Sequence, residues 1–484
     1  MAISLYTSRV VLNSLGIDDY GTYNVVGGMV GMFAVISGAL SGAISRFITF
    51  ELGKDNGEKL SRVFSTSVNI QLITSFIIII LGEIVGVWFL NHKMVIPDGR
   101  IVAANWVLQC SLLSFCINLI SIPYNACIIA HERMTAFAYI SILEAVLKLA
   151  VCFLIVISPW DRLVSYAVLL LCVAVIIRLI YGLYCHRHFQ ESHYRFIYDR
   201  DLFKEMAGFS GWSFFTNGAY VFNTQGINLL INLFFGVGVN AARGIASQVE
   251  HAVRHLVDSF TMAINPQITK SYAAGDKDSM FQLVCRGAKY SYFLLLFLSL
   301  PVFMEADQIL TIWLKTVPEH TTIFVRLSIV ATLIRIVGKP GHTASMATGK
   351  IRRYVLWVTP VYLLAFPLTW IAFSLGAVSE STYIILIVVN LVVEIVRLGV
   401  MKGLLDFPIG TFLRDVCIRI LIVTLVSLVL PLCLVLSMPQ SWWRFVLSLI
   451  LCIVNVAVSV YFLGMTVDER KHINVLISKK LHLL

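Results

Sequence analysis

One stretch of the sequence, residues 239–267, carries charged and hydrogen-bonding side chains at a spacing that gathers them together. On a helix of about 100° per residue, seven polar residues fall within about 80° of arc: Arg243, Ser247, Glu250, Arg254, Asp258, Thr261 and Asn265. The opposite side is apolar, so the pattern predicts a long amphipathic helix over residues 239–265. Because guanidinium groups beside hydroxyls are suited to holding an anion, we predict that Arg243 and Arg254 bind substrate.

A second polar stripe is expected on the preceding segment, residues 205–235. Its members are amides and hydroxyls on one side of a helix: Ser210, Asn217, Thr224, Gln225, Asn228 and Asn232. Such groups both donate and accept hydrogen bonds, which suits sugar hydroxyls in a wet passage. Hydrogen bonding between helices explains the stripe equally well. Both interpretations stay open, and Asn217, Gln225, Asn228 and Asn232 are the candidate binding residues.

These polar segments belong to a strongly apolar chain. Of its 484 residues, 58% are apolar and 13% are charged, against roughly 25% charged in ordinary soluble domains. Apolar runs long enough to cross a bilayer recur along the whole length, unlike the short alternating segments of a β-barrel. The sequence therefore predicts an all-α integral membrane protein. The charged helix is expected to line a polar cavity, because charges facing lipid cost several kcal/mol each.

About fourteen transmembrane helices are predicted. The first, residues 1–15, is too short to cross and holds Arg9 mid-segment, so we expect an incomplete first helix instead of a signal peptide. The others are expected at residues 23–45, 63–90, 101–130, 137–157, 163–185, 205–235, 239–265, 283–304, 323–348, 354–375, 382–401, 418–436 and 443–463. Of the 37 Lys and Arg residues, 23 fall in the even-numbered connections and the tail, and 5 in the odd-numbered ones. This asymmetry predicts that the even connections and the C-terminus are cytoplasmic.

The chain also resembles itself. Residues 15–55 and 235–277 share a glycine turn, a helix and a second glycine turn, and each unit opens a group of six spans. An even number of crossings between them predicts a parallel repeat, in which two six-helix lobes rock around a central site. We predict an N-terminal lobe, a cytoplasmic linker, a C-terminal lobe, and two extra helices with a basic tail, at residues 1–190, 191–204, 205–403 and 404–484.

Cations outnumber acids among the residues predicted at membrane depth. The cations are Arg9, Lys148, Arg178, Arg243, Arg254, Arg326, Arg335, Lys339 and Arg397, and the acids are Glu83, Glu144, Glu250, Asp258 and Glu394. The excess favours an anionic cargo, since an empty cationic cavity is costly unless water or substrate compensates it. Glu144 with Lys148, and Glu394 with Arg397, have helix-pair spacing, which favours structural ion pairs.

Acidic residues inside the bundle are candidates for coupling transport to an ion. Glu83 is alone in an apolar helix, and Glu250 and Asp258 lie in the charged stripe. A carboxylate hydrogen-bonded to a neighbouring helix explains such residues at least as well. The sequence does not identify the driving ion.

The sequence contains no catalytic or metal motif, and we predict that the chain is not an enzyme and has no cofactor. The ten cysteines lie singly, mostly within spans, and are expected to be free thiols. His251 and His255 have metal-ligand spacing, but no HExxH motif surrounds them, which disfavours zinc. No phosphate-binding glycine loop marks an ATPase.

Five segments resemble a known family. They are SLYTSRVVLNSLGIDDYGTYNVVGG (residues 4–28), RFITFELGKDN (46–56), VNAARGIASQV (239–249), AINPQITKSYAAGD (263–276) and MATGKIRRY (346–354). They look like the Wzx-type polysaccharide flippases of the multidrug/oligosaccharidyl-lipid/polysaccharide (MOP) exporter superfamily, with the likeness spanning about residues 4–404. The set Glu250, His251, Arg254 and His255 is more charged than the family pattern.

The resemblance implies two lobes of six helices in a V shape, in the bacterial inner membrane. It implies transfer of an undecaprenyl-diphosphate-linked oligosaccharide from the cytoplasmic to the periplasmic leaflet, for O-antigen, capsule or exopolysaccharide synthesis. By that resemblance Arg9, Arg46 and Arg243 are candidate diphosphate contacts, while sugars occupy the polar cavity. Membrane lipids, a polysaccharide polymerase and glycosyltransferases are the further partners expected, and no nucleic acid is.

Two other functions stay open. An ion-coupled multidrug exporter of the same superfamily should have acidic residues dominating its cavity if it binds cationic drugs. A membrane polymerase or ligase for lipid-linked glycans usually works through a large periplasmic loop, whereas the longest expected here is about residues 305–322.

Overall fold

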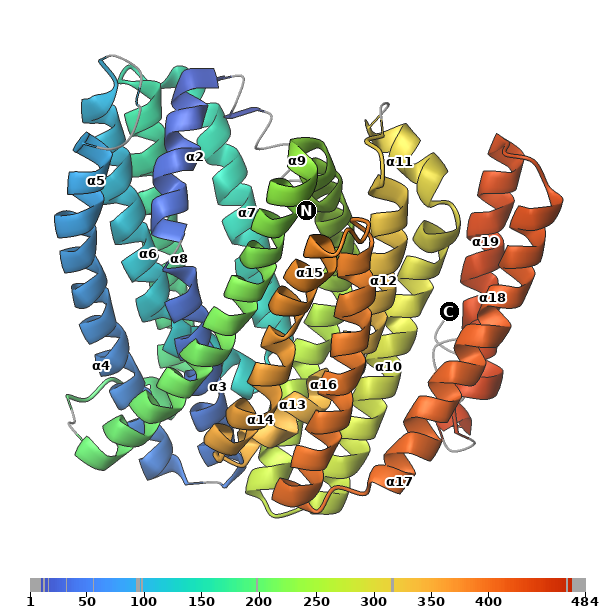
Figure 1. Cartoon of the computed structure of the whole chain (residues 1–484). Helices are drawn as coiled ribbons and strands as arrows, with labels where there is room; N and C mark the ends of the chain where they lie inside the picture. Colours follow the sequence, from blue (N-terminus) through green and yellow to red (C-terminus); the bar gives the residue numbers. More distant parts are fainter. Residues whose placement is uncertain are drawn as a thin grey trace, which may run out of the picture. The chain divides into compact units, whose positions relative to one another are not determined.

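A computed structural model of the chain describes residues 10–11, 14–15, 17–31, 33–54, 56–92, 96, 99–196, 199–314, 317–466 and 469–471. Within these ranges every regular element is a helix. The chain divides into two compact units, Met1–Gly218 (unit 1) and Ala219–Leu484 (unit 2). Figure 1 shows the elements with their labels.

Unit 1 is built around one long helix, α6 (Ile101–Ala130). The other main helices of this unit are α2 (Ile17–Gly31), α3 (Ala34–Gly53), α4 (Gly57–Leu81), α5 (Val87–His92), α7 (Met134–Ile157) and α8 (Arg162–His188). Buried residues of α6, among them Val107, Leu108 and Leu119, form an apolar core with α2, α4 and α8. Asn56 caps the start of α4, where its side-chain Oδ1 accepts a hydrogen bond from the Lys59 amide at 3.1 Å.

A π-helix, η1 (Gly82–Gly86), interrupts the span formed by α4 and α5 and carries Glu83. At Gly82 a Cβ atom would lie 2.5 Å from the Leu112 side chain of α6. Glycine therefore permits the close approach of these two helices. The extra residue of a π-turn changes which side chains share a face, so helical spacing alone does not fix where Glu83 points.

Unit 2 contains most of α9 (Arg200–Ala273), which enters it from unit 1. It continues with α10 (Lys277–Met304), α11 (Ala306–Leu314), α12 (Thr321–Val337), α13 (Lys339–Ala347), α14 (Ile351–Leu363), α15 (Ala365–Ser374), α16 (Ser381–Leu405), α17 (Ile409–Phe412), α18 (Arg419–Ser437) and α19 (Trp442–Ser459). The π-helices η3 (Leu413–Ile418) and η4 (Val460–Gly464) start α18 and extend α19. The last two helices pack against α10 around buried Tyr292, Phe293, Val423 and Val456.

The segments expected as two helices at residues 205–235 and 239–265 are the two halves of α9. They meet at Gly236, whose φ of 79° and ψ of −173° are not helical. A positive φ is readily adopted only by glycine, so this residue permits the bend. The turn expected at this glycine is present, but the helices continue directly on both sides of it.

Eleven helices of the described ranges are long and apolar enough to cross a membrane. The predicted all-α, multi-pass membrane fold is confirmed. Neither half of α9 belongs to this set, and the first predicted span lies mainly outside the described residues. The linker and lobe boundaries expected from the sequence stay a prediction.

Candidate functional site

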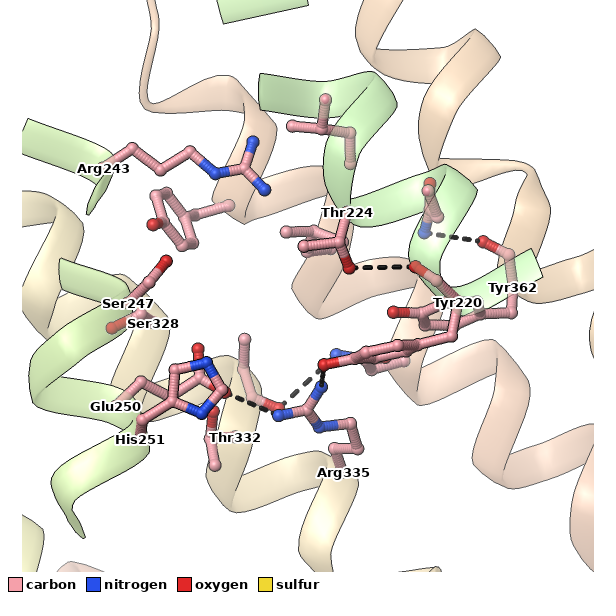
Figure 2. Close-up of a pocket in the computed structure, with 16 residues that line it drawn as sticks. Tyr220, Thr224, Arg243, Ser247, Glu250, His251, Ser328, Thr332, Arg335 and Tyr362 are labelled. Carbon is pink, nitrogen blue, oxygen red and sulfur yellow. Dashed lines mark hydrogen bonds and ion pairs between the residues drawn. The ribbon is translucent and has the colours of Figure 1, made fainter. Parts of the chain in front are cut away.

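A polar cavity of about 80 Å³ lies inside unit 2, between α9, α12, α14 and α16 (Figure 2). We call it the cationic cavity. Its polar lining is made of Tyr220, Asn223, Thr224, Arg243, Ser247, Glu250, His251, Ser328, Thr332, Arg335, Tyr362, Tyr383 and Asn390. Both halves of α9 contribute, because the bend at Gly236 turns Tyr220 on one half and Arg243 on the other towards the same space. The chain thus builds one site from residues on both sides of a single glycine.

Arg243 is the most unusual member of this lining. Its side chain is 6% exposed, and Figure 2 shows its guanidinium extending into the cavity from α9. The Nη1 atom is buried and has no hydrogen-bond partner among the described residues. A buried charge without a partner costs several kcal/mol. An anion or ordered water in the cavity would remove that penalty.

A second guanidinium faces the same space but is already paired. Arg335 Nη2 donates to Glu250 Oε1 at 2.6 Å, and Arg335 Nη1 lies 3.5 Å from the Tyr220 hydroxyl (Figure 2). The same Glu250 oxygen lies 3.5 Å from Arg254 Nη1. The Glu250 carboxylate is therefore shared between Arg335 and Arg254. No carboxylate of the described residues forms an ion pair with Arg243.

The ion-pair network continues along α9 away from the cavity. Arg254 Nη2 lies 3.1 Å from His251 Nδ1, and its Nε lies 3.3 Å from Asp258. Lys339 donates to Asp258 at 2.6 Å. With Arg243 and Arg335, the cluster holds four permanent cations and two carboxylates, an excess of two positive charges. Arg254, predicted to bind substrate, is engaged in this network, whereas Arg243 is not.

The amide stripe predicted on residues 205–235 is spread over several environments. Asn228 donates to Gln225 at 3.1 Å, and neither lines the cavity. Asn217 belongs to unit 1, where its amide nitrogen lies 3.7 Å from a Cβ built on Gly38. The Asn232 side chain lies outside the described set. Of the predicted stripe residues whose side chains the structure describes in unit 2, neither Gln225 nor Asn228 contributes to the cationic cavity.

Arg46, predicted to contact diphosphate, lies in unit 1 among aromatic rings. Its guanidinium carbon is 4.5 Å from the ring centroid of Phe47, 4.8 Å from that of Phe50 and 5.5 Å from that of Phe209. These cation–π contacts stabilise the half-buried guanidinium. Arg9, the other predicted contact in this unit, lies outside the described residues.

The three ion-coupling candidates have different surroundings. Glu250 and Asp258 are ion-paired in the network of unit 2. Glu83 is exposed on η1, and no ion pair to it is found within the described ranges. Their coupling roles stay predictions.

Several lining residues were not predicted from the sequence as site residues. The sequence analysis placed Arg335 at membrane depth but did not predict it as a binding residue. Ser328, Thr332 and Arg335 nevertheless follow one another at i, i+4 and i+7 on α12. That spacing is the signal that could have identified it. Tyr362, Tyr383 and Asn390 come from apolar helices and gave no such pattern. Asn223, whose Nδ2 donates to the Tyr362 carbonyl at 3.3 Å, lies beside the predicted stripe.

Comparisons with known proteins place the chain in a family. The model of the family described as "Polysaccharide biosynthesis protein" matches residues 2–271. The uncharacterized membrane protein EpsK of Bacillus subtilis is 20% identical over 333 residues, covering 66% of this chain and 63% of EpsK. The chain therefore spans less than two thirds of that relative's length.

Solved structures resemble the chain in fold. A MATE transporter in the straight conformation superposes with a TM-score of 0.71 at 14% identity, covering 84% of this chain and 92% of that one. A MOP superfamily transporter from Pyrococcus furiosus gives a TM-score of 0.65 at 15% identity, covering 84% and 93%. The chain belongs to the polysaccharide biosynthesis protein family and has the fold of the MATE transporters of the MOP superfamily.

Proposed function

We propose that this protein is a flippase in the bacterial inner membrane, with its C-terminus in the cytoplasm. It moves an undecaprenyl-diphosphate-linked oligosaccharide from the cytoplasmic to the periplasmic leaflet by alternating access. The family match supports a role in polysaccharide synthesis and the fold supports transport. O-antigen, capsule and exopolysaccharide synthesis are the pathways that use such a cargo.

The observation that carries this proposal is the Arg243 guanidinium in the cationic cavity, whose Nη1 has no partner among the residues that the structure describes. A diphosphate cannot cross hydrocarbon unaided, because its charges would lose their hydration. The planar guanidinium fork of Arg243 matches phosphate oxygens and replaces that hydration. The hydroxyls of Ser247, Thr332 and Tyr383, which make no hydrogen bond to other described residues, supply further donors. With a volume of about 80 Å³, the cavity suits the charged headgroup and leaves the lipid tail and most sugars elsewhere.

The charge of the cavity also bears on the exporter alternative. One similar structure is that of a multidrug resistance MATE family transporter of the MOP superfamily. A cationic drug in the cavity would meet Arg243 and Arg335, which only Glu250 opposes among the carboxylates that line it. This balance disfavours cationic cargo and favours an anion.

Deletion of the gene followed by lipid analysis tests the proposal. We expect undecaprenyl-linked repeat units to accumulate on the cytoplasmic side, and expression of Arg243→Gln to leave them there. Arg326→Gln is the matched control, because Arg326 lies in the same unit but pairs with the half-exposed Asp307 at 3.0 Å; it should restore export. Altered polymer length with normal export in the deletion strain would instead identify a polymerase function.

A further inference from the structure

Unit 1 contains a second polar cavity, of about 330 Å³, which we call the neutral cavity. Four helices enclose it: α2, α6, α7 and α8, whose positions can be followed in Figure 1. It is about four times the volume of the cationic cavity. Nothing in the proposed role of Arg243 uses this space.

One face of α6 supplies the hydrogen-bonding groups of the neutral cavity. Ser111, Ser114, Phe115 and Asn118 follow at i, i+3, i+4 and i+7, which places them side by side. Ser111, Ser114 and Asn118 make no side-chain hydrogen bond to other residues that the structure describes. Two hydroxyls and one amide are thus available to a ligand as donors and acceptors.

The charges of this cavity cancel. Lys148 Nζ lies 2.6 Å from Glu144 Oε1 on α7, and their side chains are 51% and 37% exposed. Both lie well inside a helix apolar enough to span the membrane, Met134–Ile157. Charges at that depth are costly against lipid, so the cavity that both line explains their exposure. The spacing predicted an ion pair, and the structure adds that this pair faces an open space.

The remaining walls are smooth and apolar. Gly27 and Gly31 of α2 present no side chain, and a Cβ built on either would meet nothing within 4 Å. Tyr23 and Phe115 supply aromatic surface beside them. Hydroxyls, an amide, a neutral ion pair and ring faces around an open space match an uncharged ring that bears many hydroxyl groups. They do not match a diphosphate, for which the cavity has no excess cation.

We propose that the neutral cavity binds an uncharged sugar ring, and that in the transport cycle this ring is part of the glycan of the cargo. The second half of this proposal rests on the proposed flippase function. The two units then divide recognition: the cationic cavity selects for phosphate, and the neutral cavity selects for hydroxyl groups.

Binding of two lipids to the full-length protein in nanodiscs tests this division. The probes are undecaprenyl diphosphate and the lipid-linked oligosaccharide extracted from the deletion strain. In the double variant Ser114→Val/Asn118→Leu we expect about 3- to 10-fold weaker binding of the oligosaccharide lipid, because neutral hydrogen bonds are lost. Binding of undecaprenyl diphosphate should not change. Asn105→Leu, on the same helix but outside the cavity, is the matched control and should alter neither affinity.

The outcomes separate this inference from the proposed function. Arg243→Gln should weaken both lipids; if it weakens neither, the flippase proposal fails. If Arg243→Gln acts as expected but the double variant changes neither affinity, or both equally, the neutral cavity is not a sugar site. Sodium or proton dependence lost in Glu144→Gln, with the affinity for the oligosaccharide lipid unchanged, would make it a cation site and would also overturn the inference.

Cross-linking in living cells tests the cavity without any purified cargo. A small diazirine-bearing amino acid at position 118 should yield sugar-containing adducts by mass spectrometry. The same group at Leu113, which is exposed on another face of α6, should yield only acyl-chain adducts. Acyl-chain adducts alone at position 118, or none, would show that no sugar enters this space.

Discussion

Two arginines of unit 2 are equally buried and have opposite surroundings. Arg243 and Arg444 are each 6% exposed. Arg444 Nη2 donates to Glu305, itself 2% exposed, at 3.0 Å, and its Nη1 donates to the Met438 carbonyl at 3.2 Å. Arg243 faces a cavity, and its Nη1 has no partner within the described part of the chain.

The difference separates a structural charge from a functional one. Glu305 follows α10 and Arg444 lies on α19, so their pair fastens the C-terminal helix hairpin to the rest of unit 2. A buried pair contributes little net stability, but breaking it is costly because one charge stays behind unpaired. Arg243 is in that costly condition in the structure itself. A buried guanidinium that forms no ion pair with the described residues is best explained by an anionic ligand that binds only during part of the transport cycle.

The largest expected effect is on stability, from breaking the structural pair. Arg444→Met leaves Glu305 buried and unpaired, and should lower the free energy of unfolding by about 3–5 kcal/mol. Thermal unfolding of the purified protein in detergent measures this. Adding Glu305→Leu to the same protein should recover most of the loss. If the single variant is as stable as the wild type, the two arginines do not differ as proposed.

Arg243→Gln should have the reverse profile. Its loss removes a charge-assisted contact worth about 1.5–3 kcal/mol, so pyrophosphate or undecaprenyl diphosphate should bind roughly 10- to 150-fold more weakly. Stability should not fall, because the substitution removes an uncompensated buried charge. Titration calorimetry and thermal unfolding on the same preparation give both values. A destabilised variant with unchanged anion affinity would assign Arg243 to structure.

Glu250→Gln should strengthen anion binding. In the structure Glu250 occupies Arg335 at 2.6 Å, so it competes with any anion for that guanidinium. Removing its charge should tighten pyrophosphate binding about 5- to 10-fold, equivalent to roughly 1–1.4 kcal/mol. Asp307→Asn, which removes the acid paired with Arg326, is the control and should leave the affinity unchanged. Weaker binding in Glu250→Gln would mean that this carboxylate organises the site instead of blocking it.

The smallest effect is expected at Glu469, which follows the last span and pairs with Lys289 of α10. Burial alone would raise the pKa of the Glu469 carboxyl, but hydrogen bonds from Lys289 and the Thr466 amide bring it below its ordinary value of 4.5. The stability that this contact contributes is therefore complete above pH 4.5 and is lost as the pH falls through the lowered pKa. The amide oxygen of Glu469→Gln can still accept the hydrogen bonds from Lys289 and the Thr466 amide, so the variant should unfold only slightly below the wild type at pH 7. The difference should shrink with acidification. A pH-independent difference would exclude titration of this carboxyl as its source.

Much of the fold was readable from the sequence. The span at residues 101–130 matches α6 end to end, and those at 137–157 and 382–401 lie within α7 and α16. Long apolar runs bounded by charges leave few alternatives, because backbone polar groups in a membrane must be satisfied within a helix. The turn at Gly236 was also visible as a glycine between two polar stripes. The π-helix around Glu83 was not visible, since no local pattern distinguishes it from an α-helix.

The candidate site was predicted less completely. Helical spacing placed Arg243, Glu250, Arg254 and Asp258 on one face, and they do lie together. Helical spacing could not show which of these four side chains is free to bind a ligand. That depends on the ion pairs that Arg335 and Lys339 form from other helices. The same holds for Glu144 and Lys148. Their spacing predicted the ion pair, but it could not predict the cavity that both residues line.

By itself the sequence determined that this is a polytopic helical membrane protein with a cationic polar segment in its second half, because composition and periodicity fix what each helix can expose to lipid. Only the tertiary structure decided that Arg243 is buried with its Nη1 unpartnered among the described residues, while Arg254 pairs with Glu250 and Asp258. The reason is physical: the state of a buried charge depends on the groups that packing brings within a few ångströms of it, and those groups come from helices far away in the chain.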